Sequence, residues 1–316
     1  MNKYKHKNYK FSESIKEKIE LLTKIDNWHG ILAVLEDYFF IGSSIFVTSY
    51  ITWNFYPLAV LIIGARQRAL ATLLHEAAHG ILLKNKYFNF ALGSFFSGYL
   101  IFQTFTSYQK SHVRYHHGHF GDPELDVDYK FMLNEGLYRE DVSPGKFVLQ
   151  NIYLPLFLSK VPKYLYSLVR QRFWETARKE KFIMLCYLLA ITLSSIYGHF
   201  GNLVIIFWLI PYLTTFQIIG WFIELSEHYP LMKNDCNLYM TRNRNSHWLE
   251  TFFTSIHNEN YHLVHHLNPT IPFWNQAKAH QIYLQDENYA RHDKSNGGIF
   301  ISLNNADSVI KSILYR

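Results

Sequence analysis

Long apolar runs alternate with polar blocks along the first two thirds of the chain. The first run covers residues 31–51 and is interrupted only by two acids near its beginning, so it can cross a hydrocarbon core of about 30 Å. A second run begins near Trp53, passes two arginines and continues with helical spacing through residues 69–83. We predict a membrane span followed by a long helix that is part membrane and part cytosolic.

The middle of the chain is less regular. Residues 88–108 are apolar and aromatic but contain glycines and serines, which fits a kinked or re-entrant hairpin as well as one straight span. Residues 111–141 are polar. Residues 151–181 mix basic and aromatic side chains, a composition that suits a segment lying flat on the bilayer surface.

Two further apolar runs, residues 182–200 and 203–223, predict a second membrane hairpin. The expected fold is an all-α integral membrane protein with about four transmembrane helices plus a re-entrant or extra hairpin, capped by a cytosolic histidine-lined helical domain. We divide the chain into a basic cytosolic segment (1–30), a membrane domain that holds the functional site (31–275) and a cytosolic tail (276–316).

Charge and composition place the chain at a membrane. The net charge of +6 is concentrated in lysines within the first 24 residues and in a second basic stretch, residues 160–181. Anionic headgroups explain these clusters more simply than nucleic acid, because no nucleic-acid recognition motif accompanies them. The N-terminus has no apolar signal-peptide core, so we predict that it is cytosolic. A basic N-terminus without a retention signal suits a bacterial inner membrane at least as well as the endoplasmic reticulum, and of the two we predict the bacterial inner membrane. Two cysteines are too few for a disulfide framework or a thiolate metal site.

The first candidate for chemistry is the motif His75-Glu76-Ala77-Ala78-His79. Residues four apart share one face of a helix, so both imidazoles can reach one metal ion. The same letters spell the HExxH signature of zinc proteases, in which the glutamate is the general base. Taken alone, the motif is therefore ambiguous.

Histidine recurs in later polar blocks. His112 and His116 are one helical turn apart, and three histidines near the end follow i, i+3, i+4 spacing. Another stands where the last apolar run ends. The nine predicted metal ligands are His75, His79, His112, His116, His117, His228, His262, His265 and His266.

Nine imidazoles exceed the three or four ligands of one zinc and favour a dinuclear site. Neighbouring carboxylates could orient the second ring nitrogens. The available acids are Glu76, Asp122, Glu124, Asp126, Asp128, Glu224, Glu227, Glu250 and Glu259. His119 and His257 lie near the clusters but outside their spacing, so we expect them to orient ligands or face solvent.

The motifs HEAAH (75–79), HVRYHH (112–117) and HLVHH (262–266) occur in order between apolar spans. Together they resemble the three histidine boxes of the membrane fatty acid desaturase and hydroxylase superfamily, over roughly residues 50–275. The segment around His228 resembles the isolated ligand histidine of that family, and residues 268–272 its trailing proline loop. The polar stretch 121–128 resembles bacterial members, some of which act on small natural-product intermediates.

The resemblance implies two non-haem iron ions, dioxygen as co-substrate and a narrow apolar tunnel to the irons. It implies a desaturase that introduces a double bond into a fatty-acyl or similar aliphatic chain, with a superfamily hydroxylase of a lipid or small natural product as the alternative. Because no His-Pro-Gly-Gly sequence occurs, no fused cytochrome b5 is expected. A separate ferredoxin or cytochrome b5 would then supply electrons on the cytosolic side.

Two other interpretations of the histidine motifs compete with the oxidase. An intramembrane zinc protease would use the first motif but leave seven of the nine histidines without a role. A metal transporter would carry its ligands along a path across the membrane, with ionisable residues inside the spans. The histidine clusters here follow the ends of the apolar runs instead, which favours the oxidase.

Overall fold

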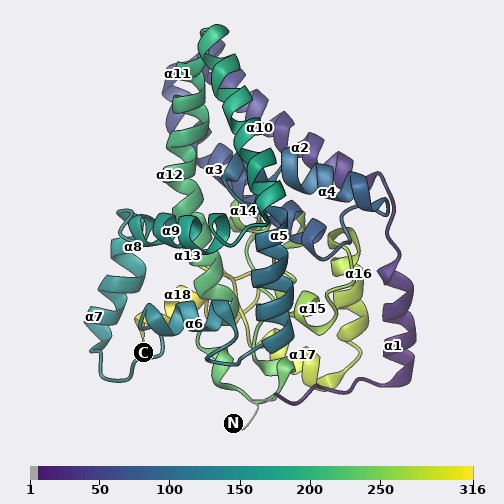
Figure 1. The fold of residues 1–316 in the computed structure, drawn as a ribbon. Coiled ribbons are helices and arrows are strands. Elements are labelled where there is room, and N and C mark those ends of the chain that lie inside the picture. Colours follow the sequence, from purple (N-terminus) through teal and green to yellow (C-terminus); the bar gives the residue numbers. More distant parts are fainter. Residues whose placement is uncertain (1–5, 316) are drawn as a thin grey trace. The chain divides into compact units, whose positions relative to one another are not determined.

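The structure, a computed structural model, describes residues 6–315 (Figure 1). These residues form helices and turns, and the only β-type pairings among them are two isolated bridges, Lys7–Cys236 and Ser246–Ser302. The predicted all-α fold is confirmed. Lys3 and Lys5 of the basic N-terminal cluster lie outside the described residues.

The chain divides into two compact units, each described by itself. The histidine unit contains the described residues up to Ile25, then Lys110–Phe157, and the chain from Phe222 onward. The membrane unit contains Asp26–Gln109 and Leu158–Trp221.

Among the described residues, four helices are long and apolar enough to cross a membrane, as predicted: His29–Ile51, Trp53–Ala78, Arg178–Tyr197 and Gly201–Lys233. The helices of the membrane unit are α2 (His29–Phe46), α3 (Tyr56–Ala78), α4 (Lys86–Phe95), α5 (Phe105–Tyr108), α9 (Val161–Ser167), α10 (Arg178–Tyr197), α11 (Gly201–Val204) and α12 (Ile210–Leu213). Figure 1 shows α10 returning as α11 and α12, which is the predicted second hairpin. The next helix, α13 (Thr215–His228), begins in the membrane unit and ends in the histidine unit.

Residues 88–108 do not form one straight helix. After α4 ends at Phe95, a short 3-10 turn (Gly98–Ile101) leads to Phe102, which has a left-handed backbone with φ 60°. The chain restarts as α5. Glu180 supports this restart, since its carboxylate accepts the backbone N–H groups of Phe105 at 2.6 Å and Thr106 at 2.9 Å.

Three of the charged residues that interrupt the first two spans, Glu36, Asp37 and Arg66, are paired within the membrane unit. The guanidinium of Arg66 donates to Asp37 at 3.1 Å and to Glu36 at 2.8 Å. Arg66 also lies over the ring of Phe40, 3.9 Å from its centroid. Pairing offsets the cost of burying charge in an apolar region, so these ions link α2 to α3.

The histidine unit holds α1 (Glu13–Glu20), α6 (Val127–Asn134), α7 (Pro144–Val148), α8 (Leu154–Leu156), α14 (Trp248–Thr254), α15 (His262–Leu267), α16 (Phe273–Tyr283), α17 (Glu287–Lys294) and α18 (Val309–Leu314). Its apolar core joins Ile15 and Ile19 of α1 to Leu263 and Val264 of α15, with Tyr289 of α17 among the other members. The core therefore lies directly beneath the helix that carries the last histidine motif. The chain after residue 276 belongs to this same packed unit.

Candidate metal centre

The first histidine motif closes α3 in the membrane unit. The rings of His75 and His79 lie 4.7 Å apart between centroids, as the i, i+4 spacing predicts. Glu76, between them, is buried at 1% exposure, and its carboxylate lies 3.5 Å from Nδ1 of His75. The side chain of Asn89 donates to the carbonyl of Ala77 at 2.8 Å and so holds the last turn of α3.

The second motif lies on a π-helical turn, Gln109–His116, except for its last residue, His117, which begins the 3-10 turn that follows. A π-helix bonds residue i to i+5 and is wider than an α-helix, so a side chain five positions on lies nearer to the same face than it would in an α-helix. Accordingly, Nε2 of His117 lies 3.1 Å from Nε2 of His112. Nε2 of His117 also lies 3.0 Å from Nε2 of His265, and these three rings form one set.

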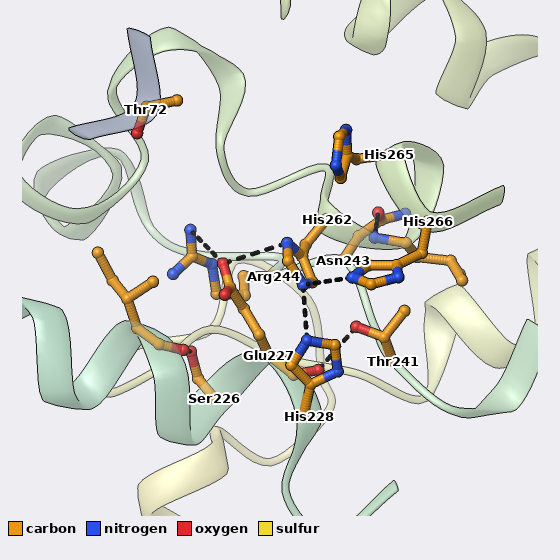
Figure 2. Close-up of polar contacts among 12 residues, drawn as sticks. Thr72, Ser226, Glu227, His228, Thr241, Asn243, Arg244, His262, His265 and His266 are labelled. Carbon is orange, nitrogen blue, oxygen red and sulfur yellow. Dashed lines mark hydrogen bonds and ion pairs between the residues drawn. The ribbon is translucent and has the colours of Figure 1, made fainter. Parts of the chain in front are cut away.

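A second set of four ring nitrogens forms in the same unit. Nε2 of His266 lies 3.3 Å from Nε2 of His116 and 3.1 Å from Nε2 of His262. Nε2 of His262 in turn lies 3.0 Å from Nε2 of His228 (Figure 2). The unit thus brings together all seven of its predicted ligands, in two sets that the residue spacing did not reveal.

Hydrogen bonding among the rings cannot account for these sets. A neutral imidazole nitrogen carries either one proton or one in-plane lone pair, so it serves one partner. Three Nε2 atoms, those of His117, His262 and His266, each face two other Nε2 atoms. Two nitrogens bound to one metal at about 2.1 Å lie about 3.0 Å apart at a right angle and about 3.4 Å apart at the tetrahedral angle. The observed separations fit shared metal ions.

Asp126 orients His116 toward its set. Its carboxylate is fully buried and accepts Nδ1–H of His116 at 2.8 Å, which leaves Nε2 to face the other rings. Burial lowers the pKa of His116, but Asp126 and Asp128 outweigh burial and raise the pKa to about 9. These acids thus favour positive charge on this ring, a charge that a cation bound at Nε2 can supply in place of a proton. Burial and the neighbouring rings instead lower the pKa of His266, which favours its neutral, metal-binding form.

Replacing Asp126 by asparagine is expected to weaken metal binding by about 10- to 100-fold. The Asp126 carboxylate also accepts the N–H groups of Gly121 at 2.9 Å and Asp128 at 3.0 Å, one on each oxygen. The asparagine of the variant has one oxygen and one NH₂ group, so its NH₂ must face one of these N–H donors. The measurement is metal content per chain after dialysis against graded chelator. Asp122→Asn is the matched control, since the Asp122 carboxylate also accepts two backbone N–H groups in this loop, at 2.9 and 3.1 Å. Its contact with a histidine is through the backbone, where its N–H donates to the carbonyl of His119, and His119 belongs to neither ring set. Equal metal retention in both variants would contradict the role given to Asp126.

A second carboxylate, Glu227, faces His262 from the end of α13. Its Oε1 lies 3.5 Å from Nδ1 of His262 and 3.7 Å from Nη2 of Arg244 (Figure 2). All three side chains are buried or nearly so. Glu227 therefore faces Nδ1 of His262 on the side of the ring away from the set, at an ion-pair distance of 3.5 Å, which is longer than the 2.8 Å hydrogen bond from His116 to Asp126.

Other predicted orienting acids have different partners. Glu250 accepts the N–H groups of Ile299 and Phe300, at 2.6 and 2.7 Å, and so anchors the C-terminal segment. Glu124 is exposed and lies 3.7 Å from Lys130. His119 is exposed and His257 lies against Phe273, and neither ring joins the two sets described above. Sequence reasoning overlooked Asn243, a buried amide in a polar loop with no periodic pattern to mark it.

The fold and site define a membrane protein with histidine clusters that could hold metal ions. A family model described as fatty acid desaturase matches residues 51–295, and the chain belongs to this family. It is 40% identical over 302 residues to a dihydrorhizobitoxine desaturase of Bradyrhizobium elkanii, covering 92% of this chain and 85% of that protein. It is 24% identical over 280 residues to a putative fatty acid desaturase 2-like protein, FADS2B, of Homo sapiens, covering 79% of this chain and 53% of that protein. The chain is therefore an oxidoreductase of the desaturase type.

Proposed function

We propose that the nine histidines named above bind two iron ions and that the protein uses them to desaturate an aliphatic carbon chain with dioxygen. The observation that carries the proposal is the convergence of seven Nε2 atoms into two sets, with 3.0 to 3.3 Å between neighbouring nitrogens. His75 and His79 are included on the family resemblance and on their shared helix face. Imidazole nitrogen is a suitable ligand for iron.

Bound iron would supply the oxidising power to remove hydrogen from an unactivated carbon. The overall reaction converts a CH–CH bond, one dioxygen, two electrons and two protons into a C=C bond and two waters. The electrons require a separate donor, for which we propose a ferredoxin or cytochrome b5 type of protein. The chain's own contribution is position, because a substrate misplaced by about 1 Å can lose on the order of 100-fold in rate.

We propose a bacterial inner-membrane location with the histidine unit on the cytosolic side. Two substrate classes fit the family membership. The first is a fatty-acyl chain, and the second is a small natural-product intermediate. The 40% identity to a dihydrorhizobitoxine desaturase over 92% of this chain supports the second class. A hydroxylase would instead convert the same substrates to alcohols, with one added oxygen atom.

The deciding experiment combines metal and product analysis. The purified chain, expressed with added iron, should contain about two irons. With a reductase and electron donor, it should convert dihydrorhizobitoxine or a fatty-acyl substrate to a product lighter by two hydrogens. A gain of oxygen would establish the hydroxylase instead. One zinc that depends only on His75 and His79 would overturn the proposal in favour of a protease.

A further inference from the structure

The helix that carries the last histidine motif, α15, begins without a cap of its own. Tyr261 precedes it and provides no side-chain acceptor, although the first N–H groups of a helix need one. The acceptor comes from a distant residue. Oδ1 of Asn243 accepts the N–H groups of Leu263 at 3.1 Å and Val264 at 3.3 Å.

The other end of the same amide is equally constrained. Nδ2 of Asn243 donates to Oδ1 of Asp293 and to the hydroxyl of Tyr289, both at 2.8 Å. Asn243 is 1% exposed, and Tyr289 is fully buried on α17. The carboxylate on one side and the two N–H donors on the other fix which end of the amide is oxygen. The α15 helix is thereby joined to α17 through one side chain.

The segment around Asn243 also holds the end of α13, which carries His228. The hydroxyl of Thr241 donates to the carbonyl of Glu227 at 2.8 Å, and the N–H of Arg244 donates to the carbonyl of Asn260 at 2.9 Å. Figure 2 shows Thr241, Asn243 and Arg244 beside the chain of rings from His228 to His266. One short segment therefore contacts both the end of α13 and the start of α15.

We propose that Asn243 is a positioning residue that sets the rotation of α15, so that His262 and His266 meet His228 and His116 at ligand distance. This inference rests on the proposed function, because it takes the ring sets as metal ligands. The α15 helix has only six residues and cannot hold its own register against neighbouring elements. A metal site needs its ligands held to within about 0.5 Å.

The test exchanges the two hydrogen-bonding partners. Asn243→Asp alone places a second carboxylate against Asp293, across a contact of 2.8 Å, and should reduce iron affinity about 10- to 100-fold. Adding Asp293→Asn restores a donor opposite the new carboxylate, and the double variant should recover most of the iron. The readouts are iron per chain after graded chelation, the Mössbauer spectrum of the bound iron, and the melting temperature.

Asn245→Ala is the matched control. Its amide donates to the same Asp293, at 3.0 Å to the carbonyl and 3.3 Å to the carboxylate, but it does not contact α15. It should lower the melting temperature and leave iron content and spectrum unchanged.

The possible outcomes separate this inference from the proposed function. Iron loss in the Asn243→Asp chain, recovered in the double variant, would support positioning. Full iron retention with only a lower melting temperature would overturn it, leaving Asn243 a purely structural residue. An unsubstituted chain that binds no iron would instead refute the proposed function.

Discussion

Replacing His266 by alanine is expected to abolish turnover and to reduce bound iron from about two to at most one per chain. Nε2 of His266 faces two other ring nitrogens, at 3.3 and 3.1 Å, so its loss removes the link between His116 and His262. The ring is buried and also stacks on His117, at 4.5 Å between centroids, so a cavity opens beside the other set. Loss of a residue that only orients a ligand lowers metal affinity by about 10- to 100-fold, so loss of the ligand itself should lower it further.

The measurement for His266→Ala is iron by elemental analysis, together with product yield by mass spectrometry. His119→Ala is the control, because His119 is an exposed histidine that follows the second motif and belongs to neither ring set. That variant should keep both irons and its activity. Undiminished iron in the His266→Ala chain would show that its ring is not a ligand.

The sequence predicted the membrane spans, and the shared helix face of His75 and His79, because both leave local patterns. A membrane span is a run of apolar residues, and four helices in the described part of the chain are long and apolar enough to cross a membrane. A histidine pair on one helix face is visible as i, i+4 spacing, and the rings of His75 and His79 lie 4.7 Å apart as this spacing predicts. These signals depend only on neighbouring residues.

The grouping of the predicted ligands into two sets was not predictable in the same way. The spacing of His112 and His116 indicated an α-helical pair, yet the π-helical turn brings His112 to His117 and sends Nε2 of His116 to the other set. Which acid orients which ring is also set by long-range packing. Asn243 lies 20 residues before the backbone group it caps, and a polar loop gives no local sign of such a contact.

A second large effect is expected in the membrane unit from Gly64→Ala. A Cβ at this position of α3 would lie 2.0 Å from the hydroxyl of Thr215 and 2.8 Å from the backbone nitrogen of Phe216. The hydroxyl of Thr215 already donates to the carbonyl of Val60 at 2.6 Å, so it is held in place. Small residues permit such close helix contacts in membranes, and overpacking of this kind costs about 1–3 kcal/mol or more.

The Gly64→Ala chain should therefore melt several degrees lower in detergent and yield less folded protein, as measured by size exclusion after heating. Gly42→Ala is the matched control, because a Cβ at that position of α2 meets nothing within 4 Å. Alanine favours a helix over glycine by about 1 kcal/mol, so the control should be unchanged or more stable. Adding Thr215→Ala removes the hydroxyl but not the nitrogen of Phe216, so rescue should be partial. Equal melting of the two single variants would mean that α3 and the start of α13 do not pack this closely.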